Sequence, residues 1–175
     1  MQLIFKTMHG SHLYGTSHDS SDRDYFEVYG WGRRKSRQTI VDGIDTLRCD
    51  FSTFLKYCNK GVPQFLEAMF SPITETNEIS FITSSYYADP ANCRKVYPRT
   101  IKHLWSKGDE ADKFIVHALR LRLNLCSIER NGRFDPVLPL PKSMALGVAK
   151  QNEDMILSKD SLDDLDMARL LGYNH

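Results

Sequence analysis

The sequence predicts an α+β fold, with strands near the start of the chain and helices in the rest. Short runs rich in apolar, aromatic and β-branched residues occur within the first fifty positions, a composition typical of strands. After Asp50 the spacing of apolar residues changes to that of a helix, and the longest helical pattern covers residues 109–130. We therefore expect a core at residues 1–72 and a helical extension at residues 73–175 that packs on it.

Three strands are expected in the core, and a further short β-prone run precedes the third. The strands cover residues 2–8, 24–29 and 44–49, and the short run covers residues 39–41. Glycines follow the first two strands closely, at Gly10 and Gly30, and end each apolar run. The strands are therefore short and separated by turns or loops.

The first helix is expected directly after the third strand. Its apolar stripe consists of Phe51, Phe54, Leu55 and Cys58. Asp50 or Ser52 suits the N-cap position, and Gly61 marks the end. Pro63 begins a second, short helix that ends near residue 70, in which Glu67 would be a buried carboxylate that needs a partner.

Beyond residue 72 the chain is expected to be almost entirely helical. The strongest helix, at residues 109–130, has a broad apolar face and is closed by Gly132. A proline-rich connection at residues 135–142 leads to two weaker helices near 143–153 and 159–171.

The charges balance over the whole chain but not along it. Lys and Arg number 23 against 22 for Asp and Glu, which excludes a global field that attracts polyanions. Residues 91–142, however, hold eleven basic and five acidic side chains. The chain shows no signal-peptide pattern, no membrane-length apolar run and no CxxC pair, so we expect a cytoplasmic protein without a membrane partner.

Two carboxylates and a glycine-serine turn form the most informative pattern. Asp22 and Asp24 are one residue apart, a spacing that puts both side chains on one face of a strand. Side-by-side carboxylates need a cation between them, and Mg²⁺ or Mn²⁺ suits oxygen ligands. Gly10 and Ser11 can approach a phosphate closely, and Gly15 adds a second permissive point. These parts indicate metal-assisted phosphoryl or nucleotidyl transfer.

A basic loop at residues 31–37 offers one aromatic and several cationic side chains. Trp31 precedes Arg33, Arg34 and Lys35, and the loop contains no acid. Such a set can stack on bases and contact phosphates of single-stranded nucleic acid, although it also suits an exposed loop. We take Arg33, Arg34 and Lys35 as possible substrate-binding residues.

The spacing of these motifs resembles a known family. Gly10-Ser11-x-x-Tyr14-Gly15, followed by Ser21-Asp22-x-Asp24, is similar to the signature of the polymerase-β-type nucleotidyltransferases. The stand-alone bacterial and phage branch associated with RNA repair ligases is the most similar, and Tyr14 stands where that family often has Arg. Weaker similarities follow at residues 45–49, 63–67 and 117–120.

The resemblance implies a small mixed sheet backed by helices and a defined chemistry. Mg²⁺ or Mn²⁺ would be held by Asp22 and Asp24, and a nucleoside monophosphate would pass from an NTP, expected to be ATP, to an acceptor hydroxyl. Nucleotide binding would fall to the turn, which comprises Gly10, Ser11, Tyr14 and Gly15.

The resemblance also implies a third carboxylate that serves as metal ligand or base. Asp45 heads the family-like strand and is the first choice, while Asp50 and Asp42 are alternatives that strand register decides. His117 and Arg120 match a later helix of the family and are possible substrate contacts.

The acceptor is expected to be RNA, such as tRNA. Two alternatives stay open from the sequence. The chain can be a catalytically weak nucleotide-binding antitoxin or regulatory module that acts through a protein partner, or a nucleotidyltransferase that modifies a protein hydroxyl, as an AMPylase does.

Overall fold

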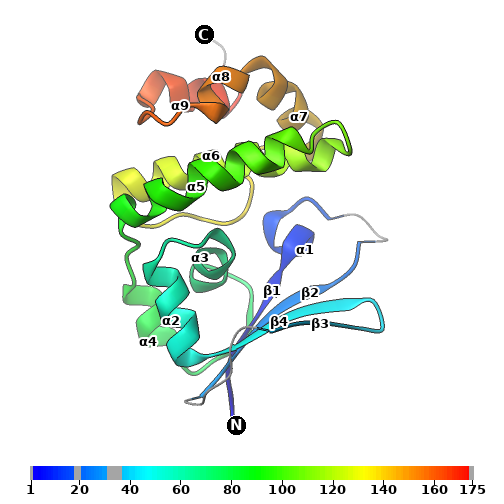
Figure 1. The fold of residues 1–175 in the computed structure, drawn as a ribbon, viewed down its shortest axis with the longest axis vertical. Helices are drawn as coiled ribbons and strands as arrows, with labels where there is room; N and C mark the ends of the chain where they lie inside the picture. Colours follow the sequence, from blue (N-terminus) through cyan, green and yellow to red (C-terminus); the bar gives the residue numbers. More distant parts are fainter. Residues whose placement is uncertain (1, 18–20, 31–36, 174–175) are drawn as a thin grey trace.

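The structure, a computed structural model, describes residues 2–17, 21–30 and 37–173 and confirms the α+β fold. A twisted sheet with its covering helices forms one end of the elongated molecule, and a layer of helices forms the other (Figure 1). Residues 31–36 lie outside the described residues. The substrate-binding role of Arg33, Arg34 and Lys35 therefore stays a prediction.

The sheet is mixed and has the strand order β3-β4-β2-β1-β5. Its strands are β1 (Leu3–His9), β2 (Asp24–Tyr29), β3 (Arg37–Val41), β4 (Ile44–Asp50) and β5 (Thr74–Asn77). β1 is antiparallel to both β2 and β5, β3 is antiparallel to β4, and β2 is parallel to β4. The parallel pair brings the N-terminal ends of β2 and β4 to the same edge of the sheet.

A two-residue hairpin connects β3 to β4. Asp42 and Gly43 both have positive φ, 52° and 77°, as the tight turns of twisted hairpins require. The short β-prone run at 39–41 is thus an edge strand of its own, and Asp42 lies exposed at the hairpin tip.

Two helices cover one face of the sheet. α2 (Phe51–Asn59) begins at Asp50, whose side chain accepts a hydrogen bond from the backbone N–H of Thr53 at 2.7 Å. α3 (Pro63–Met69) has proline in its first turn. Aromatic rings from both helices and from the sheet pack at centroid distances of 5.1 to 5.8 Å, among them those of Phe26, Phe54 and Phe65.

One strand was not expected. β5 pairs with β1 at the edge of the sheet, so the sheet continues past residue 72 and the expectation of an almost entirely helical remainder is wrong at this point. The sequence Thr-Glu-Thr-Asn carries no apolar alternation, because both faces of this edge strand are polar or exposed. α4 (Ser80–Ser85) follows it, and the division into units at 72 stays a prediction.

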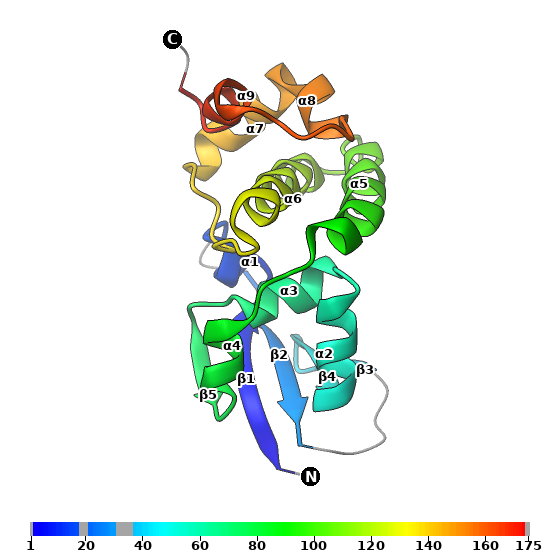
Figure 2. The ribbon, with the colours of Figure 1, turned by 90° about the vertical axis from the view of Figure 1, so that its left-hand side faces the viewer.

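The helical layer is built around a hairpin of two long helices. Its elements are α5 (Pro90–Ser106), α6 (Asp112–Asn131), α7 (Lys142–Gln151), α8 (Glu153–Leu157) and α9 (Asp164–Leu170). α6 lies beside α5 and beneath the later helices, as Figure 2 shows, and is buried along most of its length. It is the strongest predicted helix and begins three residues later than expected. None of the described helices is long and apolar enough to cross a membrane.

Candidate active site

The glycine-serine turn lies at the end of β1, which pairs with β2 and β5 in the interior of the sheet. β1 ends at His9, and the short helix α1 (Gly10–Tyr14) follows without a linker. Gly10 has a φ of 63°, and a Cβ atom at this position would overlap the Asp24 carboxylate. Glycine adopts the positive φ without strain and has no Cβ atom to overlap the carboxylate. The backbone of the turn can therefore lie directly against Asp24.

Asp24 and Asp45 are neighbours across the parallel strand pair. They are direct partners in the register of β2 and β4. Asp22 precedes β2, which begins at Asp24, so the two do not alternate along one strand as the sequence spacing suggested. Asp22 and Asp24 nevertheless line the same cleft, and Asp24 and Asp45 line a smaller hollow that shares Gly10 and Tyr14 with it.

The negative charges act on one another. Partial burial, and then the charges of Asp45 and Asp22, raise the pKa of Asp24, while His12 opposes the shift. Asp45 accepts a hydrogen bond from Gln38 through Oδ2, but its Oδ1 is buried without a hydrogen-bond partner among the described residues. A cluster of carboxylates with a buried oxygen that accepts no hydrogen bond from the described residues is suited to binding a cation.

The cluster suits a particular kind of metal site. Within the described parts of the chain, no three His, Cys, Asp or Glu side chains converge closely enough to hold a metal ion by themselves. Mg²⁺ takes one or two carboxylates and completes its shell with water and substrate phosphates. Asp22, Asp24 and Asp45 therefore fit an ion that arrives with a nucleotide rather than a closed structural site.

The other two candidates for the third carboxylate lie elsewhere. Asp50 is buried at the N-cap of α2, and its partner on β2 is Tyr29, at the opposite end of the strand from Asp24. Asp42 lies in the exposed hairpin turn. Of the three, Asp45 alone is a register partner of Asp24.

The main cleft, of about 960 Å³, lies between the turn and the helical layer. One wall contains Gly10, Ser11, Tyr14, Asp22 and Asp24, and the other is formed by the N-terminal turns of α6 and α7. The side chains of this second wall are Asp112, Lys113, Phe114, Val116, His117, Lys142, Ser143 and Leu146. The Lys142 ammonium donates to the Thr16 carbonyl at 2.9 Å and so ties α7 to the residues after the turn.

Sequence reasoning missed the two lysines of this wall. Lys113 lies four residues before His117, a spacing that puts both on one face of α6, so the predicted His117 could have pointed to it. Lys142 is the last residue of the proline-rich segment and carried no such signal.

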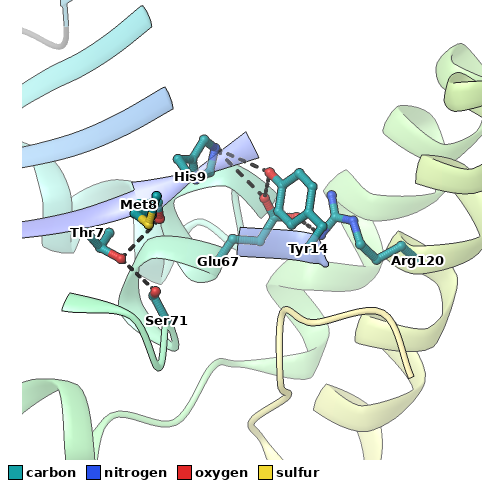
Figure 3. A network of polar contacts seen from close by, with 7 residues as sticks. All are labelled: Thr7, Met8, His9, Tyr14, Glu67, Ser71 and Arg120. Carbon is teal, nitrogen blue, oxygen red and sulfur yellow. Dashed lines mark hydrogen bonds and ion pairs between the residues drawn. The ribbon is translucent and has the colours of Figure 1, made fainter. Parts of the chain in front are cut away.

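The structure separates two of the predicted substrate contacts. His117 lines the cleft, but Arg120 is 4% exposed and its guanidinium is paired with Glu67. Arg120 Nη1 donates to Glu67 Oε1 at 2.6 Å, and the Tyr14 hydroxyl donates to Glu67 Oε2 at 2.7 Å (Figure 3). Glu67 thus has the partner that its burial requires, and Arg120 lies behind the cleft wall.

This buried network also includes His9, the last residue of β1. His9 Nε2 lies 3.4 Å from the Tyr14 hydroxyl and 4.0 Å from Glu67 Oε2. Burial lowers the pKa of His9 and raises that of Tyr14 well above its usual value. The Tyr14 ring therefore borders the cleft, while its neutral hydroxyl is held by Glu67.

Comparison with known families agrees with the resemblance in the sequence. Residues 1–166 match the RNA repair pathway DNA polymerase beta family, RlaP. No curated protein matches the chain.

Proposed function

The chain belongs to the RNA repair pathway DNA polymerase beta family, and from this we propose that it transfers a nucleoside monophosphate from an NTP to a hydroxyl group on RNA. The family supports a nucleotidyltransferase role. The observation that carries the proposal is that Asp24, the register partner of Asp45, lies directly beside the Gly10 backbone and lines a cleft large enough for a nucleotide.

Asp22, Asp24 and Asp45 would hold Mg²⁺, or Mn²⁺ in its place. When bound, such an ion neutralises phosphate charge and makes the α-phosphorus more electrophilic. Two observations support this assignment. Burial, and then the charges of Asp45 and Asp22, raise the pKa of Asp24, and Asp45 Oδ1 has no hydrogen-bond partner among the described residues.

The turn would bind the triphosphate. Gly10 allows phosphate oxygens to approach the backbone, and Ser11 supplies a hydroxyl and an N–H group at the start of α1. From the opposite wall, Lys113 and Lys142 would balance the remaining phosphate charge, and the Phe114 ring would offer a surface for the base. We expect ATP as the donor.

Asp45 would take the proton of the acceptor hydroxyl. The acceptor oxygen forms a bond to the α-phosphorus as the bond to the pyrophosphate oxygen breaks, and pyrophosphate leaves with the electron pair. Asp45 Oδ1 accepts no hydrogen bond from the residues that the structure describes, and Gln38 donates to Oδ2 and holds the carboxylate in place.

Labelled nucleotides test the proposal. The protein is incubated with each α-labelled NTP, Mg²⁺ and a cell extract that contains RNA and protein. We expect label in RNA with the wild type and none with Asp22→Asn/Asp24→Asn. The matched control, Glu153→Gln/Asp154→Asn, removes two exposed carboxylates of α8 and should transfer label normally.

The other outcomes identify the rival functions. Label that appears in protein side chains would indicate a protein-modifying enzyme, and nucleotide binding without any transfer would indicate a regulatory module or antitoxin. Equal labelling by the wild type and Asp22→Asn/Asp24→Asn would contradict catalysis at this site.

A further inference from the structure

Helix α5 carries several positive charges and no negative one. Its seventeen residues contain Arg94, Lys95, Arg99 and Lys102 but neither Asp nor Glu. Arg94 differs from the others because it pairs with Glu129 at 2.6 Å. The remaining three cations belong to the basic segment that the sequence charge count singled out, and the candidate active site does not use them.

These three cations lie on one exposed face of the helix. Positions 95, 99 and 102 follow the spacing that places side chains on the same side of an α-helix, and all three are exposed. The opposite side of α5 is buried through Cys93 and Tyr97. Between Lys95 and Lys102 the helix rises by about 10 Å, so the charges form a row rather than a point.

Nothing in the described parts of the chain neutralises this row. No ion pair is formed there by Lys95, Arg99 or Lys102, and Lys95 donates only to the Asn92 amide oxygen, at 3.2 Å. The exposed large apolar side chains of the described residues all lie outside α5. A membrane-binding helix or a protein interface needs apolar anchors beside its charges, whereas a phosphate backbone does not.

The row continues at the N-terminal end of α5. There the Asn92 amide donates to the Asn59 carbonyl at 2.9 Å, which joins α5 to the end of α2, and the exposed Lys60 follows Asn59. We call the exposed cations Lys60, Lys95, Arg99 and Lys102 the basic track.

The other end of the track leads to the cleft. α5 and α6 run side by side and are joined at the end where the cleft lies (Figure 1). In this corner the ammonium groups of Lys107 and Lys113 lie 5.7 and 5.4 Å from the centre of the Phe114 ring. Lys113 and Phe114 line the cleft themselves. Exposed cations thus run from the end of α2 along α5, and Lys107 and Lys113 lie on either side of the connection to α6, which also holds the exposed acids Asp109 and Glu110.

We propose that the basic track binds the sugar-phosphate backbone of the RNA acceptor and directs its reacting end into the cleft. The identity of the acceptor as RNA rests on the proposed function, whereas the place of binding rests on the track itself. Phosphates along a single strand lie on a line that exposed lysine and arginine side chains in a row can follow.

A salt series tests the track. Binding of a fluorescein-labelled single-stranded RNA of mixed sequence is measured by anisotropy, without NTP, at increasing salt. Each phosphate contact contributes about 0.7 to the slope of log K against log salt. Lys95→Gln/Arg99→Gln removes two such contacts and should therefore lower the slope by about 1.4. The affinity that the protein gains when the salt falls from 1 M to 0.1 M should then be roughly 25-fold smaller in the variant than in the wild type.

A matched variant controls for net charge. Lys159→Gln/Arg169→Gln also removes one exposed lysine and one exposed arginine, but beside α9, and should bind RNA like the wild type. An equal loss of slope in both double variants, or no salt-dependent RNA binding by the wild type, would overturn the proposal.

Failure of the proposed function gives a different result. Asp22→Asn/Asp24→Asn should lose nucleotidyl transfer and keep the wild-type salt slope for RNA. If the wild type binds RNA through the track but transfers no nucleotide, the proposed function is wrong and RNA binding by the basic track is supported. If the wild type transfers nucleotide to RNA and Lys95→Gln/Arg99→Gln has the wild-type salt slope, RNA binding by the basic track is contradicted and the proposed function is not.

Discussion

The guanidinium of Arg120 lies over the ring of Tyr14, with 3.5 Å between its central carbon and the ring centroid. Tyr14 ends the helix α1 that borders the cleft, and Arg120 belongs to the central helix of the helical layer. Glu67, on α3, is hydrogen-bonded to both. A buried charge pair and a cation-π contact thus join α1, α3 and α6 at one place.

Removal of the Glu67 charge should destabilise the fold. Glu67→Gln leaves the Arg120 guanidinium buried without a counter-charge, so the free energy of unfolding should fall by about 3–5 kcal/mol in denaturant titrations. The control Glu75→Gln breaks the more exposed pair with Lys6 and should cost less than about 1 kcal/mol. Equal effects of the two substitutions would contradict this account of the network.

Gly10 should not tolerate a side chain. Gly10→Ala places a methyl group into the Asp24 carboxylate, in addition to the strain of its positive φ, and should displace Asp24 and abolish transfer. Gly43→Ala has a similar φ of 77° but open space around it, so it should cost about 1–3 kcal/mol of stability and leave transfer intact. Turnover and urea melts of both variants check the prediction, which fails if Gly10→Ala remains active.

Substitution of Asp45 should lower activity, whereas substitution of Asp50 should lower stability. Asp45→Ala should lower kcat by roughly 10²-fold or more, as the loss of a general base does, with little change in stability. Asp50→Ala removes the N-cap of α2 and should instead cost about 0.5–2 kcal/mol of stability. Paired kcat and denaturant-midpoint measurements distinguish them, and a folded but inactive Asp50→Ala enzyme would reverse the assignment.

His117 should make stability depend on pH. Burial, and then the nearby Arg120 charge, lower the pKa of His117 to about 4. Below pH 6.5 the unfolded chain binds a proton there that the folded protein does not, so stability is lost as the pH falls from about 6.5 to 4, by up to roughly 3 kcal/mol.

Two substitutions isolate this contribution. His117→Gln should reduce the pH dependence of the unfolding free energy, measured in denaturant between pH 4 and about 7.5. The buried His9, whose pKa is also lowered, should maintain a smaller dependence of the same sign. His103→Gln, at an exposed position on α5, should leave the slope as it is in the wild type. An unchanged slope in His117→Gln would show that other groups cause the loss.

The parts of the site that are close in the chain could be predicted from the sequence. Gly10, Ser11 and Asp24 follow a local spacing, and the strand, turn and strand that carry them are short-range features. The choice between Asp45 and Asp50 could not be made in this way. It depends on which residues of β4 pair with β2, and only the assembled sheet fixes that register.

Contacts between distant segments account for what the sequence missed. Arg120 was predicted as a substrate contact from its match to a helix of the family. Its partner, Glu67, is 53 residues away, and no local pattern links the two. Lys113 and Lys142 line the cleft only because the helical layer closes over the turn. β5 was not predicted because a polar edge strand has no alternation of apolar residues.

The bond between Lys142 and the Thr16 carbonyl joins residues 126 positions apart. A growing chain therefore leaves the ribosome with its carboxylates and glycine turn long before the second wall of the cleft has been synthesised. Contacts of such high sequence separation form late and slow the folding of a domain. We expect nascent chains that end before α7 to hold the first half of the site without being able to enclose a nucleotide.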